Sequence, residues 1–248
     1  MQVERVERLV AEFEVEKIVD KGYGYEEKYL LFKGVKIPYK AIIKKGALIA
    51  IVSRKYHLIP NELIEELCKQ IAERRKWKIV VDKTETSIHV SMGRDGVGVV
   101  VANRVDGYGA LRVDLYITIN GAKVIYKIKK DDELEQVYKK HYKGAKIVID
   151  DLEKIVDAVL SKVDDLKYLI NRMDKIQANK IYDELKILED LIPKKYIQTA
   201  MRLLQYRVTL KQFYSKVASE IWSADISMDT KIRYFDYLNN ITFAIVAQ

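Results

Sequence analysis

Residues 78–127 read KIVVDKTETSIHVSMGRDGVGVVVANRVDGYGALRVDLYITINGAKVIYK, and this stretch decides the fold of the first half of the chain. Short apolar runs alternate with the dipeptides Asp95-Gly96, Asp106-Gly107 and Asn120-Gly121. Such dipeptides accept positive φ angles and form tight hairpin turns. The pattern therefore predicts antiparallel strands at Lys78–Asp82, Ser87–Met92, Val97–Ala102, Ala110–Thr118 and Ala122–Lys127.

The residues before this stretch predict a second group of strands and two helices. Ile, Val and Tyr are frequent in Tyr29–Phe32, Val35–Ile43 and Ala47–Ser53, which we interpret as a meander, with Pro38 at an edge or a bulge. The apolar spacing at residues 60–76, with Pro60 and Glu62 at its start, indicates a helix. The spacing over residues 3–18 also predicts a short amphipathic helix.

After residue 148 the pattern becomes helical. Apolar residues repeat with alternating spacings of four and three from Leu152 to Met173, which is a heptad stripe. Further helices are expected at 181–192, 196–222 and 228–246. The stripe is expected to form the seam of an internal helical bundle; a self-association surface is the alternative.

Glycine and charge are distributed unevenly along the 248 residues. All 11 glycines precede residue 145, and residues 1–147 carry the whole net charge of +8, whereas residues 148–248 are neutral. We therefore predict an α+β protein of two domains. Residues 1–147 would form a basic domain with antiparallel β meanders around one or two helices, and residues 148–248 an all-α helical bundle.

Composition excludes several classes of protein. The apolar content of 49% is typical of a globular chain, and a single cysteine, Cys68, excludes a disulfide framework. No run of residues is apolar enough to span a membrane, and the acidic N-terminal stretch does not resemble a signal peptide. We expect a cytoplasmic protein that requires no cofactor. The abundance of Lys, Ile, Val and Tyr is typical of thermophilic proteins, and we expect a thermophilic archaeal source.

Clusters of basic residues with interleaved aromatic side chains are the strongest functional signal. Cations neutralise phosphates, and aromatic rings stack on unpaired bases, so this combination predicts binding of single-stranded DNA in replication or strand annealing. A solvated, lysine-rich surface is the alternative interpretation. The predicted nucleic-acid-binding residues are Arg54, Lys55, Tyr56, Arg74, Arg75, Lys76, Trp77, Lys78, Arg104, Tyr108, Arg112, Lys127, Lys129, Lys139 and Lys140.

Two other functions are weighed against this one. A metal-dependent nuclease needs carboxylates that converge on its ions, and Asp82, Glu85, Asp106 or Asp114 are the candidates. The chain could instead be an assembly module that acts through the heptad face of Leu152–Met173, as a homo-oligomer or with a host factor. We favour neither, and we predict no catalytic residue. We also predict no metal site, because the three histidines have no ligand spacing.

Three segments resemble a family of phage and plasmid proteins catalogued as domain of unknown function 932. They are Val52–Glu62, Asn103–Val113, and Ile119-Asn120-Gly121 followed by Lys139-Lys140-His141. The chain departs from the family pattern at Arg104, Tyr108 and Thr118. The resemblance covers about residues 50–145. It implies a viral or mobile-element setting and brings no established activity.

Overall fold

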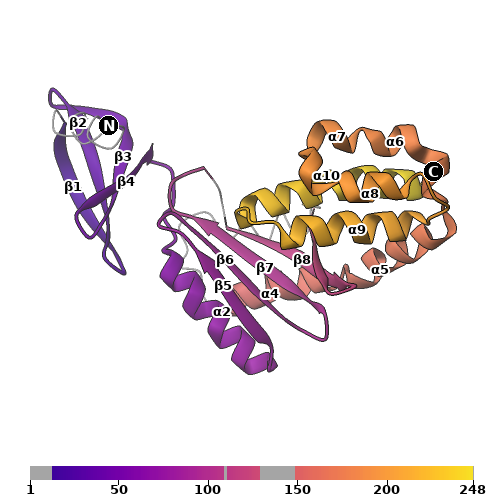
Figure 1. Cartoon of the computed structure of the whole chain (residues 1–248). Helices are drawn as coiled ribbons and strands as arrows, with labels where there is room; N and C mark the ends of the chain where they lie inside the picture. Colours follow the sequence, from indigo (N-terminus) through magenta and orange to yellow (C-terminus); the bar gives the residue numbers. More distant parts are fainter. Residues whose placement is uncertain (1–12, 109–110, 129–148, 248) are drawn as a thin grey trace.

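The structure is a computed structural model that describes residues 13–108, 111–128 and 149–247. Two antiparallel sheets and a set of helices form it, which confirms the predicted α+β class. The molecule is elongated. A four-stranded sheet lies at one end, a five-stranded sheet in the middle and most of the C-terminal helices at the other end (Figure 1).

The N-terminal sheet is a meander in which each strand pairs with the next. Its strands are β1 (Glu14–Gly22), β2 (Tyr25–Phe32), β3 (Val35–Lys44) and β4 (Ala47–Ser53). The helix predicted for residues 3–18 is wrong from residue 14 onward, and residues 1–12 lie outside the described part. Val15 pairs with Leu30 and Ile18 with Lys28, so ladder hydrogen bonds to β2 replace those of a helix.

Pro38 lies where the pairing of β2 and β3 slips. Tyr29 pairs with Lys40 but Leu31 pairs with Lys36, so β3 has extra residues at this point. A bulge accommodates a residue that has no N–H group, as the sequence predicted.

The five-stranded sheet confirms the hairpin turns predicted at Asp95-Gly96 and Asn120-Gly121. Its strands are β5 (Lys78–Lys83), β6 (Ser87–Arg94), β7 (Val97–Arg104), β8 (Arg112–Ile119) and β9 (Ala122–Tyr126), in that order. Asp95 and Gly96, and likewise Asn120 and Gly121, all have positive φ angles, as two-residue hairpin turns require. Asp106-Gly107 does not form the tight turn that was predicted: it lies in a longer connection, because β7 ends at Arg104 and β8 begins at Arg112.

Helices cover this sheet. Helix α2 (Asn61–Arg75) and helix α4 (Ile149–Leu160) pack against its central strands, while α9 (Leu210–Ser223) and α10 (Met228–Ala247) pack against β9. Asn239 of α10 donates a hydrogen bond to the carbonyl oxygen of Ile125 at 2.9 Å and accepts one from the Tyr214 hydroxyl at 2.6 Å. One continuous apolar core therefore includes residues on both sides of residue 147.

The last helix, α10, confirms the prediction for residues 228–246, but the other C-terminal helices are shorter than the sequence predicted. The heptad segment divides into α4 and α5 (Val163–Arg172), and residues 181–192 divide into α6 (Tyr182–Lys186) and α7 (Leu188–Leu191). The helix predicted for 196–222 is interrupted between α8 (Gln198–Leu203) and α9. Short 3-10 turns at Met173–Lys175, Ala178–Ile181 and Lys194–Tyr196 join these pieces.

The heptad stripe is packed inside the chain. Leu152, Val156, Val159, Leu166 and Ile170 are all buried in the main core. The stripe is thus packed inside one chain, which agrees with the internal packing that was predicted. The predicted seam of a helical bundle is not confirmed, because α4 packs against β7, β8 and α2. In the part of the chain that the structure describes, no helix is long and apolar enough to cross a membrane.

Candidate nucleic-acid interface

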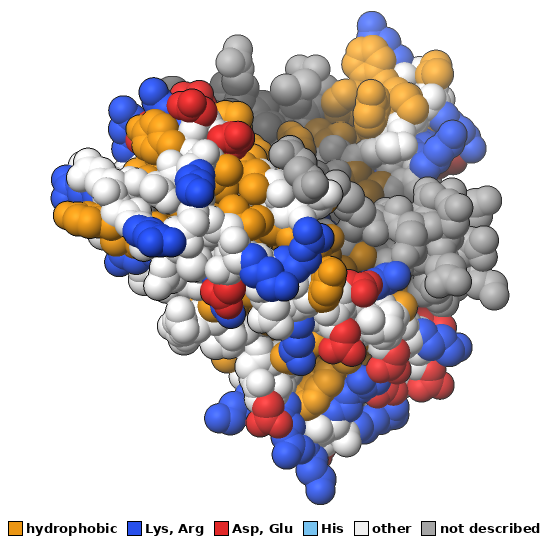
Figure 2. Space-filling view, turned by 90° about the vertical axis from the view of Figure 1, so that its right-hand side faces the viewer, with side chains coloured by type: hydrophobic (Ala, Val, Ile, Leu, Met, Phe, Trp, Pro, Cys, Tyr) orange, Lys and Arg blue, Asp and Glu red, His pale blue; other side chains and the backbone are white. Residues whose placement is uncertain are grey.

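The N-terminal sheet is the most basic part of the described chain. Residues 13–55 contain nine Lys and one Arg against four Glu and one Asp, a net charge of +5. The helical end is different: Figure 2 shows Lys and Arg side chains interspersed with Asp and Glu there, in keeping with the zero net charge of residues 148–248. Positive charge is therefore concentrated at the end of the molecule that holds β1–β4.

Four exposed lysines on or beside this sheet, Lys17, Lys33, Lys45 and Lys55, have no carboxylate within ion-pair distance among the described residues. Lys33 and Lys45 occupy the first position of the β2–β3 and β3–β4 turns, and Lys55 follows β4. Both turn lysines have positive φ angles and each precedes a glycine. Nζ of Lys33 lies 5.5 Å from the centroid of the Phe32 ring, and the side chain of Lys45 lies beside Gly24. Both lysines are exposed, so a phosphate can reach them.

Three cations surround the ring of Tyr29, which lies on β2 between Lys17 of β1 and Lys40 of β3. The Nζ atoms of Lys17 and Lys40 lie 4.3 and 5.3 Å from the ring centroid, and the guanidinium carbon of Arg54 lies 5.4 Å from it. Cations at these distances are attracted to the ring face. Burial raises the pKa of the Tyr29 hydroxyl, which donates a hydrogen bond to Glu27.

A buried ion pair fixes this sheet to the chain after β4. The side chains of Glu27 and Lys40 are 1% and 2% exposed, and Nζ of Lys40 lies 2.8 Å from Oε1 of Glu27. The same Nζ donates to the carbonyl oxygen of Tyr56 at 2.6 Å. Burial lowers the pKa of Lys40, and its hydrogen bond to Glu27 opposes that effect. The pair positions the backbone of Tyr56 beside the sheet.

A cavity of about 620 Å³ lies next to β4. Its walls are Ile49, Ala50, Ile51, Val52 and Ser53 of β4 together with Tyr56, Asp106, Gly107 and Tyr108. Tyr56 and Tyr108, two aromatic residues of the predicted binding set, thus meet at one site although they are 52 positions apart in the sequence.

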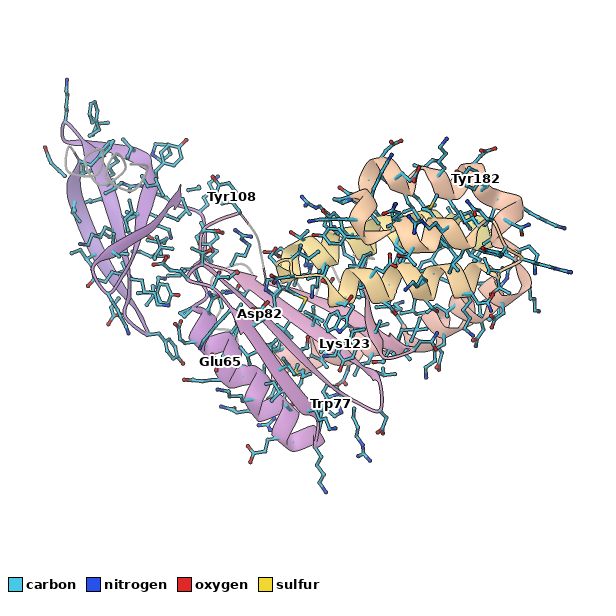
Figure 3. All side chains as sticks on the ribbon, viewed as in Figure 1. Glu65, Trp77, Asp82, Tyr108, Lys123 and Tyr182 are labelled. Carbon is cyan, nitrogen blue, oxygen red and sulfur yellow. The ribbon has the colours of Figure 1, made fainter. Side chains whose placement is uncertain are left out.

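Tyr108 is held at the rim by the turn that precedes it. Asp106 accepts a hydrogen bond from the backbone N–H of Tyr108 at 3.1 Å, and Gly107 has a φ of 80°. A Cβ atom at Gly107 would lie 2.7 Å from Cγ1 of Val52, so the turn sits directly on β4. The side chain of Tyr108 is 89% exposed and points away from the body of the molecule (Figure 3). Its ring is therefore available to a ligand.

Tyr56 forms a fixed wall of the cavity. Its hydroxyl donates to the carbonyl oxygen of Arg104 at 2.9 Å. Burial, with the nearby Asp106 carboxylate, raises the pKa of Tyr56 to about 12, so the hydroxyl stays protonated at neutral pH. The Asp106 carboxylate is held by Arg104, whose guanidinium keeps the pKa of that carboxyl below its usual value against the effect of burial.

All five predicted arginines and the predicted Lys127 are paired with carboxylates. Arg54 pairs with Glu16, Arg74 and Arg75 with Glu153, Arg104 with Asp106 and Asp229, Arg112 with Asp114, and Lys127 with Asp236. Arg75 also lies over the ring of Trp77, which packs against the main core. These pairs tie elements together, and a phosphate would have to compete with a carboxylate at each of them.

Three other predicted cations are exposed, and three lie outside the described residues. Lys55, Lys76 and Lys78 have no carboxylate partner in the described part of the chain, and Lys76 and Lys78 lie at the far end of α2 from the cavity. Lys129, Lys139 and Lys140 lie outside the described residues. The structure thus brings Lys55, Tyr56 and Tyr108 near one another and leaves Lys76, Trp77 and Lys78 elsewhere.

The four carboxylates proposed for a nuclease site lie in different environments. Asp82 and Glu85 are exposed on β5 and the turn after it, Asp106 is bound by Arg104, and Asp114 is fully buried beside Arg112. Among the described residues, no group of three or more His, Cys, Asp or Glu side chains is arranged to hold a metal ion. His89, one of the three histidines, is instead within 3.0 Å of Asp229.

The sequence did not single out four residues of the N-terminal sheet: Lys17, Tyr29, Lys33 and Lys45. The net charge of residues 13–55 could have indicated them, because it can be counted from the sequence alone. No family model, curated protein or solved structure matches the chain.

Proposed function

We propose that this protein binds single-stranded nucleic acid, most directly DNA, through the sheet β1–β4 and the cavity beside it. The observation that carries the proposal is the set of exposed lysines Lys33, Lys45 and Lys55, which lack carboxylate partners among the described residues, on a sheet of net charge +5. Cations in such a set gain counterion-release free energy when they meet phosphates.

Aromatic side chains on the same sheet favour a single strand over a duplex. Tyr23, Phe32, Tyr39 and Tyr108 are exposed on or beside it. A base can stack on an aromatic ring only when it is not already stacked in a duplex, and each such contact stabilises a complex by about 1–3 kcal/mol. The aromatic rings thus add a contribution that duplex DNA cannot use.

The rest of the chain has a supporting role in this proposal. We propose that the C-terminal helices act as a bundle that braces the five-stranded sheet, and that the protein works in replication or strand annealing. The viral or mobile-element setting that the family resemblance implies, and a cytoplasmic location, belong to the same proposal.

A salt titration of oligonucleotide binding tests the proposal. Fluorescence anisotropy with a labelled single strand should show an affinity that falls steeply as salt increases, with a log–log slope of about −0.7 for each phosphate contact. The triple variant K33Q/K45Q/K55Q should bind more weakly and show a shallower slope. The matched control is K175Q/K180Q/K186Q, which removes the same charge from exposed lysines of the helical end.

Three results would contradict this function. They are absence of binding at low salt, affinity that does not depend on salt, and equal losses in the two triple variants. A parallel titration with RNA and with duplex DNA of the same sequence ranks the three ligands. Duplex binding at least as tight as single-strand binding would remove the argument from the aromatic residues.

A further inference from the structure

The cavity lies along the open edge of β4. This strand is the last in its sheet and pairs only with β3. The cavity is lined by Ile49, Ala50, Ile51, Val52 and Ser53, which are consecutive residues. Successive side chains of a strand point to opposite faces, so a cavity that touches all of them faces the edge of the strand and not one face.

Two hydrogen bonds show which peptide groups of β4 point into this cavity. The N–H of Arg54 donates to the carbonyl oxygen of Pro38 in β3 at 2.9 Å, and the carbonyl oxygen of Ser53 turns away from β3 to accept from the N–H of Tyr56 at 2.9 Å. In an antiparallel pair the direction alternates from residue to residue. The N–H and C=O of Ile51 therefore point outward, to the cavity side.

The outward peptide groups of Ile51 have no hydrogen-bond partner among the described residues. They offer one donor and one acceptor side by side at the wall of the cavity. The exposed ring of Tyr108 stands at the rim and supplies a flat apolar surface. A ligand that fits both is planar and carries donors and acceptors along one edge.

We propose that this cavity receives one unpaired base of the bound strand, which stacks on Tyr108 while its edge meets the peptide groups of Ile51. The inference rests on the proposed function, since it names how the single strand is held. The Asp106 carboxylate in the wall is paired with Arg104, so it opposes the neighbouring phosphates little. All four bases present donors or acceptors on the Watson–Crick edge, so binding tolerates many sequences.

The test compares two single strands of equal length and charge, one an oligothymidylate and the other an abasic deoxyribose-phosphate strand. Phosphate contacts are the same in both, so any difference in affinity comes from bases. The wild-type protein should prefer the oligothymidylate by about 5-fold to 150-fold, the range expected for one stacked base.

Two pairs of variants place that preference at the cavity. Tyr108→Ala should abolish it, whereas Tyr206→Ala should leave it unchanged, because Tyr206 is an exposed tyrosine of the helical end. Ile51→Pro removes the outward N–H without touching the β3 ladder and should weaken the preference; Ile51→Val keeps the N–H and should not. Circular dichroism checks that each variant is folded.

The outcomes separate the inference from the proposed function. Equal binding of both strands with a normal salt dependence overturns the base site and leaves the nucleic-acid function standing. A preference that survives both Tyr108→Ala and Ile51→Pro places base contacts elsewhere and overturns the base site as well. No binding of either strand overturns both. If a short peptide of alternating Glu and Val binds in an Ile51→Pro-sensitive manner while the two strands bind alike, the edge receives a peptide strand and the inference is wrong.

Discussion

Nε2 of His89 lies 3.0 Å from Oδ1 of Asp229, although the two residues are 140 positions apart in the sequence. His89 is on β6 and Asp229 is in the first turn of α10, so the contact joins the central sheet to the last helix. The other oxygen of Asp229 accepts from Arg104 at 2.9 Å. The carboxylate thus links two strands of the sheet to α10.

Asp229→Asn should lower the free energy of unfolding by about 1 kcal/mol at neutral pH, because the partly exposed side chain loses its ion pair with Arg104 and weakens its hydrogen bond with His89. The hydrogen bond from His89 lowers the pKa of Asp229. A lowered pKa stabilises the folded state above the unfolded pKa, and that stability is lost as the pH falls through the folded pKa. Urea unfolding between neutral pH and acid should therefore show a weaker acid dependence in the variant. The control is Asp174→Asn, which removes an exposed pair with Lys211; an equal effect there would contradict the prediction.

Asp114 should produce the opposite pH dependence. Burial raises the pKa of its carboxyl from 3.8 to about 6, while Arg112 opposes that effect. Between those two values the folded state binds more protons than the unfolded state, so the free energy of unfolding falls as the pH rises. The total change is about 3 kcal/mol.

Asp114→Asn should remove this dependence, because an amide does not ionise. The measurement is urea unfolding of both proteins at several pH values between the two pKa values. Parallel curves for wild type and variant would show that Asp114 is not the cause.

Removing one partner of the Glu27–Lys40 pair should lower the free energy of unfolding much more than replacing both partners with apolar residues. Glu27→Ala leaves Lys40 buried without its partner and should destabilise the fold by about 3–5 kcal/mol. The double variant E27L/K40M removes both charges and should recover most of that loss. A double-mutant cycle of E27L, K40M and E27L/K40M, measured by chemical denaturation, gives the coupling. If the two single variants and the double variant are additive, the two side chains do not act as a pair.

Gly107→Ala should destabilise the turn that carries Tyr108 by about 1–3 kcal/mol, because it places a side chain at a φ of 80° and against Val52. Gly34→Ala is the matched control, since Gly34 has a φ of 73° but open space around it. The difference between the two variants in thermal or urea unfolding isolates the contact with Val52. Val52→Ala removes the atom that the new Cβ would meet, so Gly107→Ala should destabilise the Val52→Ala protein less than it destabilises the wild type. An equal loss in both backgrounds would argue against this packing.

Local sequence signals determined most of the strands. The dipeptides Asp95-Gly96 and Asn120-Gly121 placed their hairpins correctly because the required φ angles are properties of those residues themselves. The α2 helix and the burial of the heptad stripe followed from periodicity in the same way. Periodicity failed at residues 14–18, where pairing with β2 prevailed over a helical spacing, and at the breaks of the C-terminal helices, where packing set the ends.

The candidate site depended on contacts that no local pattern encodes. The sequence by itself determined that positive charge gathers before residue 147 and that Tyr56 and Tyr108 are aromatic residues near it. Only the tertiary structure decided that Glu153 forms ion pairs with Arg74 and Arg75 and that Asp229 forms one with Arg104. It also decided that Lys33 and Lys45 stay exposed without a carboxylate partner among the described residues. The physical reason is that the pairing of a charge is set by distances in space, and those distances arise only when distant elements pack together.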